Sequence, residues 1–266
     1  MVKMASFRHC SFVVCYFPLE PLVTHSPSDL DAFHQRLLDQ YNELAGLSGE
    51  LAHEIKNPLS VIRMNMDLLA EDFADAATPE ERRALAKIEM VHRQCTRLEN
   101  LLNDFLKFAR LRELELQPRR LNQLLERVLD LYQAQADENG VEIVRQLEED
   151  LPSVMLEEQT FNAAVINLVK NSLEAMGEEG GQLIVRSRQT RTGVAVDLID
   201  TGAGMDEETA MRMFEPFYTT KHGGSGLGLP TARKVIEAHG GTIHVHSEVG
   251  RGTLFTLEFP TPTRIS

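Results

Sequence analysis

The stretch Leu51–Ser60, LAHEIKNPLS, places a histidine, a glutamate and an asparagine next to a proline, between segments that have a helical pattern. Proline removes a backbone hydrogen bond from a helix and crowds the carbonyl four residues earlier, so we expect a bend within one turn of His53. Asn57 lies four residues after His53 and therefore on the same helix face, and Glu54 is adjacent. The stretch predicts three polar side chains gathered beside a bend.

Apolar residues on both sides of this stretch follow a heptad pattern. Steps of four and three residues, with one position skipped, connect Leu37, Tyr41, Leu44, Ser48, Leu51, Ile55, Pro58, Ile62 and Leu69. A second row consists of Ile88, Val91, Cys95, Leu98, Leu102 and Phe105. Between the rows, Phe73–Pro79 breaks the pattern, and Thr78 can cap a new helix that has Pro79 at its first position.

Two helices joined by a short loop form an antiparallel hairpin. Because one hairpin cannot bury both of its apolar stripes, we expect two chains to pair into a four-helix bundle, which makes the protein a homodimer. In this register His53 lies midway between Leu51 and Ile55, so its imidazole should face solvent. The alternative for a single helical histidine is a hydrogen-bonded residue at the edge of a core.

An exposed imidazole is largely neutral near neutral pH and has a nitrogen lone pair available for nucleophilic attack. A carboxylate that holds one ring nitrogen raises the nucleophilicity of the other, and Glu54 is placed for that task. Metal binding is disfavoured, because the spacing differs from the HExxH pattern and position 57 is an asparagine. These features favour His53 as a nucleophile.

After Arg112 the pattern changes to a mixture of helices and strands. Helices are predicted from Leu121 through Tyr132, at Glu158–Met176 and at Pro230–Ala238, and strands at Val141–Leu147, Ser153–Leu156, Leu183–Arg188, Val194–Ile199, Thr242–Ser247 and Thr253–Phe259. Because strands also follow one another directly, we expect an α+β fold, a two-layer α/β sandwich, and not a doubly wound sheet. The predicted division is a leader at 1–36, a helical hairpin at 37–113, an α/β domain at 114–262 and a tail at 263–266.

Two glycine-containing stretches in this second domain suggest a ligand site. Asp200–Gly204, DTGAG, follows a strand, so a carboxylate stands at a strand end where glycines permit close approach; in isolation it could be only a turn. His222–Pro230, HGGSGLGLP, leads into a helix, a combination suited to phosphate groups. Its glycine spacing matches neither the P-loop nor the dinucleotide-binding pattern. Met213–Lys221, between them, could form a mobile cover over a nucleotide.

Composition narrows the class of protein. The chain has 266 residues, of which 42% are hydrophobic and 25% charged, and a formal net charge of −13, which disfavours nucleic-acid binding. Three cysteines, Cys10, Cys15 and Cys95, are too few for a disulfide framework, so a cytoplasmic location is expected. The apolar stretch Ser11–Leu19 is shorter than the ~20 residues of a membrane span, so we expect no direct membrane insertion. A degenerate signal peptide is the alternative to a flexible or partner-dependent leader.

Taken together, the motifs resemble the transmitter module of two-component sensor histidine kinases over about Leu44–Pro260. The resemblance comprises an H-box around His53, an N-box at Asn167–Ala175, a G1-box at Asp200–Gly204, an F-box at Phe214–Phe217 and a G2-box at Gly224–Gly228. All five motifs occur in the order of that family. The resemblance implies a dimerisation and phosphoacceptor domain followed by an ATP-binding domain of the gyrase, Hsp90 and MutL type.

The resemblance also implies roles for the matching residues. His53 would accept the γ-phosphoryl group of ATP with Glu54 as the hydrogen-bonding base, and Asn57 would orient a water in a reverse phosphatase reaction. Asn171 would ligate Mg²⁺ with support from Asn167. The remaining nucleotide-binding positions would be Asp200, which accepts a hydrogen bond from the adenine amino group, together with Gly202, Gly204, Phe214, Lys221, Gly224, Gly226, Leu227 and Gly228.

The implied function is that of an ATP-dependent protein-histidine autokinase. We find no receiver domain in the sequence, so the phosphoryl group is expected to pass to an aspartate of a separate response regulator. Two alternatives are a gyrase- or Hsp90-like ATPase, which would need a catalytic glutamate in place of Asn167, and a non-enzymatic ATP-binding dimeric scaffold. The H-box argues against the ATPase.

Overall fold

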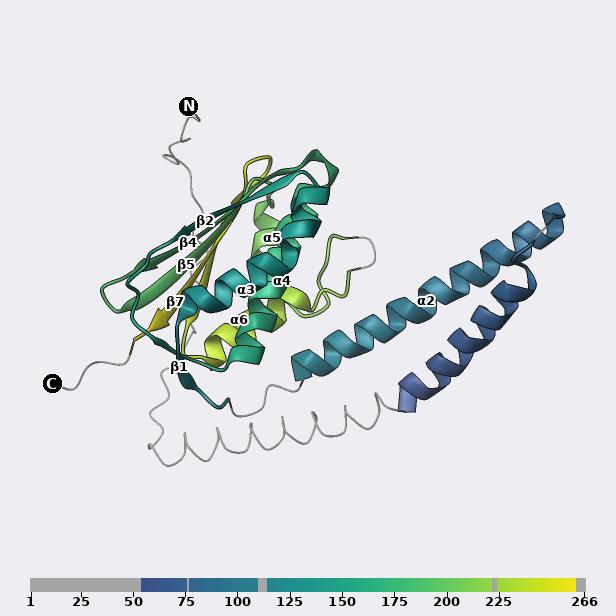
Figure 1. The fold of residues 1–266 in the computed structure, drawn as a ribbon, viewed down its shortest axis with the longest axis horizontal. Helices are drawn as coiled ribbons and strands as arrows, with labels where there is room; N and C mark the ends of the chain where they lie inside the picture. The colour runs from purple at the N-terminus through teal and green to yellow at the C-terminus, as the bar shows by residue number, and fades with distance from the viewer. Residues whose placement is uncertain (1–53, 76, 110–113, 222–223, 262–266) are drawn as a thin grey trace. The chain divides into compact units, whose positions relative to one another are not determined.

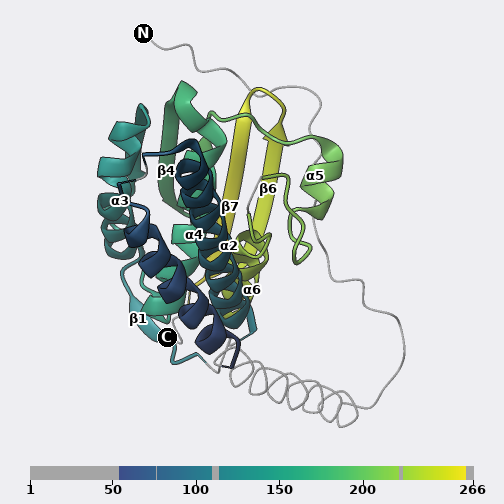
Figure 2. The ribbon, with the colours of Figure 1, turned by 90° about the vertical axis from the view of Figure 1, so that its right-hand side faces the viewer.

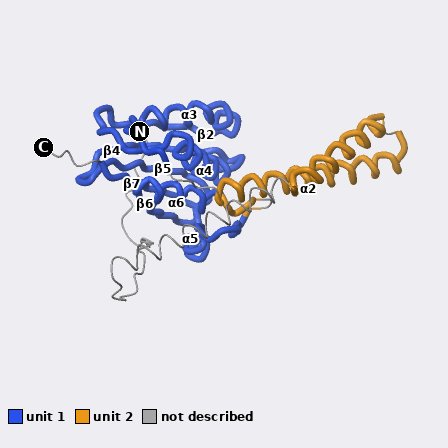
Figure 3. Tube along the Cα trace, turned by 90° about the horizontal axis from the view of Figure 1, so that it is seen from below, with its two compact units in different colours: residues 1–19, 113–220, 228–266 blue, residues 20–112, 221–227 orange. Residues whose placement is uncertain are grey.

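The computed structural model describes residues 54–75, 77–109, 114–221 and 224–261. His53, the whole expected leader at 1–36 and the tail at 263–266 lie outside these residues. The described residues belong to two compact units, shown in Figure 3: one holds a pair of helices together with residues 221–227, and the other holds a β-sheet with its helices. Among the described residues, no helix combines the length and the apolar character that are needed to cross a membrane.

The helical unit contains two successive helices with a turn between them. Residues 54–72 are helical, and the second helix, α2, spans Pro79–Ala109 (Figure 1). At its start, Thr78 Oγ1 accepts a hydrogen bond from the Glu81 N–H at 3.2 Å, while the Glu81 carboxylate accepts one from the Thr78 N–H at 2.9 Å. This reciprocal capping box confirms the predicted break at Phe73–Pro79 and the cap at Thr78.

Two polar side-chain contacts show that these helices run antiparallel. Arg63 Nη1 lies 3.5 Å from Glu99 Oε2, and His92 Nε2 lies 3.2 Å from Asp67 Oδ1. A later residue on the first helix therefore faces an earlier residue on α2. The predicted antiparallel hairpin is present in the described residues.

A single hairpin buries only part of its apolar surface. Leu59 and Cys95 are buried, and Met66 and Phe73, which follow Leu59 at seven-residue intervals, are half-buried. The predicted row on the first helix is different: Ile55, Ile62 and Leu69 stay exposed, as do Val91 and Leu98 on α2. One chain thus leaves an apolar stripe uncovered on each helix.

The second unit contains a five-stranded sheet in the order β2-β4-β5-β7-β6. Its strands are β2 (Val141–Leu147), β4 (Gly181–Gln189), β5 (Gly193–Asp200), β6 (Thr242–Glu248) and β7 (Gly252–Pro260). β2 pairs in parallel with β4, and the other neighbours are antiparallel. A separate two-stranded sheet joins β1 (Gln117–Arg119) to β3 (Val154–Leu156).

Three helices cover one face of the five-stranded sheet: α3 (Leu121–Glu138), α4 (Glu158–Met176) and α6 (Gly228–Ala238) (Figures 1 and 2). The short helix α5 (Glu207–Arg212) and a 3₁₀ turn at Gly177–Glu179 complete the unit. This arrangement confirms the predicted two-layer α+β fold. β1 and α5 were not predicted.

The core lies between these helices and the sheet. Alternate residues of β7, namely Phe255, Leu257 and Phe259, are buried, and the ring of Phe161 on α4 packs against Phe259 with centroids 5.7 Å apart and planes at 68°. Burial of each such side chain contributes roughly 1.5–3 kcal/mol. The core thereby fixes α4, and the polar residues that α4 carries, against the sheet.

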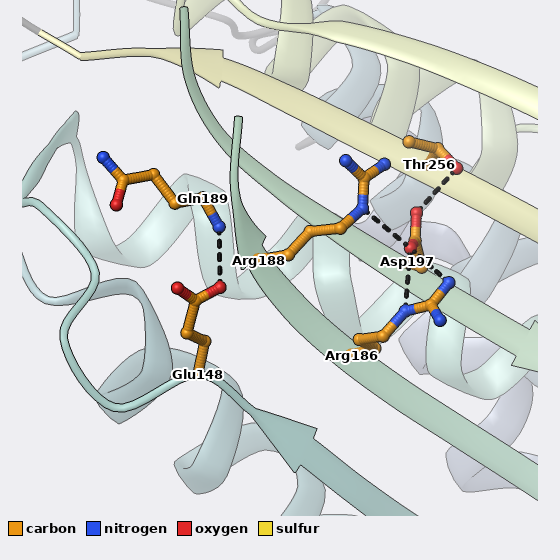
Figure 4. Close-up of polar contacts among 6 residues, drawn as sticks. All are labelled: Glu148, Arg186, Arg188, Gln189, Asp197 and Thr256. Atoms are coloured by element: carbon orange, nitrogen blue, oxygen red, sulfur yellow. Dashed lines mark hydrogen bonds and ion pairs between the residues drawn. The ribbon is translucent and has the colours of Figure 1, made fainter. Parts of the chain in front are cut away.

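The opposite face of the sheet carries a charged network centred on Asp197 (Figure 4). Its Oδ2 accepts hydrogen bonds from Arg186 Nη2 at 2.8 Å and Arg188 Nε at 3.3 Å, and its Oδ1 accepts one from Thr256 Oγ1 at 2.8 Å. The Asp197 side chain is only 3% exposed. Burial opposes its ionisation, but the hydrogen bonds outweigh burial and lower the pKa of Asp197. The network ties together β4, β5 and β7.

Candidate functional site

Asp200, the last residue of β5, is 1% exposed and receives hydrogen bonds from three different elements. Ser172 Oγ on α4 donates to Oδ2 at 3.0 Å. The N–H groups of Gly202, in the following loop, and of Thr253, on β7, donate to Oδ1 at 3.0 and 3.1 Å. Such donors offset the free-energy cost of burying a carboxylate. They also hold this hydrogen-bond acceptor in one orientation.

The loop after β5 passes very close to its neighbours, which explains two of its glycines. A Cβ atom on Gly202 would lie 2.8 Å from the carbonyl carbon of Ala175. Gly204 has φ +66°, and a Cβ atom there would overlap the Glu248 carbonyl oxygen. The Ala203 N–H also donates to the Ala175 carbonyl at 3.0 Å. The loop is therefore fastened to the end of α4.

Asn167 and Asn171 lie one turn apart on α4, and both are half-buried. Their amide oxygens are of the type that Mg²⁺ accepts as ligands. Among the described residues, no cluster of three His, Cys, Asp or Glu side chains is suited to a metal. A Cβ atom on Gly228, the first residue of α6, would lie 3.8 Å from Asn167 Cγ. The N-terminus of α6 thus lies beside Asn167.

The segment between α5 and α6 carries the other predicted positions. Phe214 is half-buried, and the guanidinium carbon of Arg233 lies 5.4 Å from its ring centroid. Phe217 is 61% exposed and has φ +67°, a backbone conformation that is uncommon outside glycine. Lys221, Gly224, Gly226 and Leu227 follow; Gly226 has φ +66° and Leu227 is buried.

The predicted residues divide between the two compact units. Asn167, Asn171, Asp200, Gly202, Gly204, Phe214 and Gly228 belong to the sheet-containing unit. Glu54, Asn57, Lys221, Gly224, Gly226 and Leu227 belong to the helical unit. Glu54 and Asn57 are exposed on the helix at 54–72, and His53 lies outside the described residues. Their roles remain predictions.

The sequence analysis did not identify two of the donors that hold Asp200, the Ser172 hydroxyl and the Thr253 backbone N–H. Ser172 does carry a signal, because it lies four residues after Leu168 on the buried face of α4 and is a polar residue in an apolar row. A polar group at such a position must find a partner inside the protein. Thr253 acts through its backbone N–H, which residue type does not reveal.

Comparison with known proteins assigns both units. The family model of the His kinase A phospho-acceptor domain matches residues 43–114, and that of the histidine kinase-, DNA gyrase B- and HSP90-like ATPase matches residues 157–263. The solved catalytic domain of histidine kinase ThkA is 33% identical, with a TM-score of 0.51, and 96% of that domain is covered by 55% of this chain. The chain belongs to the sensor histidine kinase family.

Longer members of this family match both units of the chain. Sporulation kinase E of Bacillus subtilis (strain 168) is 32% identical over 225 residues, which are 85% of this chain and 30% of that protein. The crystal structure of full-length ShkA in complex with AMPPNP is 30% identical, with a TM-score of 0.65, over 82% of this chain and 46% of ShkA. The chain therefore spans less than half the length of these two relatives.

Proposed function

We propose that the chain is an ATP-dependent protein-histidine autokinase that binds ATP in its sheet-containing unit and phosphorylates His53. The observation that carries this proposal is the buried carboxylate of Asp200, held by Ser172, Gly202 and Thr253 at the end of β5. Membership in the histidine kinase family supports the same conclusion, as do the separate matches to a phosphoacceptor domain and an ATPase domain.

The proposed nucleotide site combines a base-binding end and a phosphate-binding end. Asp200 accepts a hydrogen bond from the adenine amino group, and Gly202 and Gly204 shape the loop that follows it. The triphosphate lies near the N-terminus of α6, because the dipole of a helix favours anions at that end. The family resemblance implies that Lys221, Gly224, Gly226 and Gly228 also bind the phosphates. The family resemblance adds Phe214 and Leu227 to the nucleotide-binding residues. Asn171, supported by Asn167, would hold Mg²⁺. The bound ion would neutralise charge on the phosphates.

The transfer step needs positioning more than covalent help from the protein. A nitrogen of the His53 imidazole attacks the γ-phosphorus, so a P–N bond forms while the P–O bond to ADP breaks. Glu54 holds the other ring nitrogen and stabilises the charge that develops on the ring. Asn57, one turn from His53, orients a water molecule in the reverse phosphatase reaction.

Two partners complete the proposal. The phosphohistidine passes its phosphoryl group to an aspartate of a separate response-regulator receiver domain. A second copy of the chain covers the apolar stripe that Ile55, Ile62 and Leu69 leave exposed, which yields a homodimeric four-helix bundle. Because the reaction consumes ATP, a cytoplasmic location belongs to the same proposal.

Incorporation of phosphate from radiolabelled ATP tests this function. We expect the full-length chain with Mg²⁺ to acquire a label that is stable in base and labile in acid, and we expect His53→Gln to abolish it. His92→Gln, on α2, serves as a matched control and should retain the label. Release of free phosphate without labelled protein would support the ATPase alternative, and ATP binding with neither product would support a scaffold.

A further inference from the structure

His239 is an ionisable residue that is only 4% exposed and lies directly after α6. Its Nδ1 is 2.7 Å from the carbonyl oxygen of Val235, and its Nε2 is 3.0 Å from the backbone nitrogen of Glu157. A carbonyl can only accept and a backbone amide can only donate, so Nδ1 carries the proton and Nε2 accepts. The ring is therefore neutral, and both of its nitrogens are used. The Phe161 ring meets it nearly edge-on, with centroids 6.4 Å apart.

These two hydrogen bonds connect the ends of two helices. Val235 belongs to the last turn of α6, whereas Glu157 is the N-cap of α4. The Glu157 carboxylate in turn accepts from the N–H groups of Gln159 and Thr160 at 3.2 and 2.8 Å. The imidazole thus bridges the C-terminal end of α6 to the capped N-terminal end of α4.

The other end of α6 also meets α4, because the N-terminal Gly228 lies beside Asn167. The two helices are therefore antiparallel, and the separation from Gly228 to His239 matches that from Asn167 to Glu157 within one residue. A slip of α6 by one residue along α4 would move its N-terminus by about 1.5 Å. The bridge at His239 resists this slip.

We propose that His239 is a positioning residue of the nucleotide site, because it sets the place of α6 along α4 and hence the distance between the N-terminus of α6 and Asn167. The inference rests on the proposed function, in which the phosphates of ATP lie at these two groups. His239 does not touch the nucleotide; it acts through the helix that holds the phosphates. Displacements of about 1 Å at reacting groups can cost up to ~10²-fold in rate.

A matched pair of substitutions in the full-length chain tests this role. In His239→Asn the short amide can still donate to the Val235 carbonyl but does not reach the Glu157 N–H. In His239→Gln the longer side chain restores an acceptor for that N–H. We expect His239→Asn to raise the Kd for Mg·ATP about tenfold, and His239→Gln to stay within about threefold of the unmodified chain.

A second ligand separates positioning from a general loss of stability. Adenosine lacks phosphates and binds through the hydrogen bond of its adenine amino group to Asp200. Its Kd should therefore not change in His239→Asn. Thr256→Val, which removes one hydrogen bond on the opposite face of the sheet, serves as the destabilised control and should leave both Kd values unchanged. All measurements are made well below the melting temperature of each variant.

The outcomes distinguish this inference from the proposed function. Equal Kd values for Mg·ATP in folded His239→Asn and the unmodified chain overturn the positioning role alone. A parallel loss of adenosine binding, or an equal effect of Thr256→Val, also overturns it. Failure of the unmodified chain to bind Mg·ATP overturns the proposed function and this inference together. Phe161→Leu, which loosens the ring contact to His239, provides the same comparison if His239→Asn does not fold.

Discussion

At the scale of single residues, the effect of the charge of Asp200 can be separated from the effect of its shape by substitution with asparagine. An asparagine there could keep Oδ1 toward the N–H groups of Gly202 and Thr253 and turn its NH₂ group toward the Ser172 hydroxyl, which can accept. The fold would then tolerate the substitution. The face presented to a base would nevertheless change, because an acceptor would be replaced by a donor.

We therefore predict that Asp200→Asn binds ATP roughly 10- to 100-fold more weakly, since two donors facing each other cost about 1–3 kcal/mol. The preference should shift toward a 6-oxo purine nucleotide such as ITP, whose oxygen accepts from the new NH₂ group. Calorimetric titration with ATP and ITP measures both effects. Ser172→Ala, which removes the hydroxyl donor to Asp200 and keeps the carboxylate, is the milder control. Unchanged ATP affinity in Asp200→Asn would contradict the assignment of this residue to the adenine amino group.

At the scale of helices and strands, strong periodicity was sufficient for prediction. The bounds of α4 and β2 agree with the sequence analysis, because α4 shows a long apolar row and β2 a short β-branched run. β1 and α5, with three and six residues, are too short to show a period, and β1 forms only by pairing with the distant β3. The N-cap at Asp206, whose Oδ1 accepts from the Thr209 N–H at 2.8 Å, was the available signal for α5.

The network around Asp197 gives the sheet a pH dependence. Hydrogen bonds from Thr256, Arg186 and Arg188 lower the pKa of this carboxyl in the folded state in spite of burial, so its contribution to stability is present above the unfolded-state pKa of about 4. That contribution is lost as pH falls through the lower folded-state pKa. We expect Asp197→Asn to reduce the free energy of unfolding at neutral pH by about 1–3 kcal/mol.

Urea denaturation of Asp197→Asn and the unmodified chain, repeated from neutral pH to pH values below about 4, measures this contribution. The difference between the two proteins should shrink as the solution becomes more acidic. Thr256→Val should show about 1 kcal/mol of destabilisation at neutral pH, because one hydrogen bond is lost. A deficit in Asp197→Asn that is independent of pH would show that the carboxylate charge does not stabilise the sheet.

At the scale of the whole molecule, the exposed stripe on the first helix predicts self-association. Ile62 is 43% exposed on this stripe, and Met64, on the same helix, is 59% exposed but projects about 160° away from it. A glutamate at position 62 would place a charge inside the paired bundle, whereas one at position 64 would remain in solvent. We expect Ile62→Glu to sediment as a monomer and Met64→Glu as a dimer. Sedimentation of both as dimers would exclude this stripe from the interface.

Only some residues of the candidate site could be predicted from the sequence. The position of Asp200 at a strand end before two glycines identified it as a candidate, whereas Asn167 and Asn171 were identified through the resemblance to the histidine kinase family. The partners that orient these elements are distant in sequence: Ser172 and Asp200 are 28 residues apart, Asp200 and Thr253 are 53 apart, and Glu157 and His239 are 82 apart. Such pairs arise only when the chain folds, and one sequence without relatives does not indicate them.

The convergence of a helix, a loop and a strand on the Asp200 carboxylate has a thermodynamic consequence. A molecule that binds there contacts a point shared by α4, β5 and β7, so it binds the native state and not the unfolded chain. By mass action, a ligand at a hundred times its dissociation constant adds about 2.7 kcal/mol to the native state. The cellular ATP level would then act as a chemical chaperone for this unit, and depletion of ATP would shorten the lifetime of the protein itself.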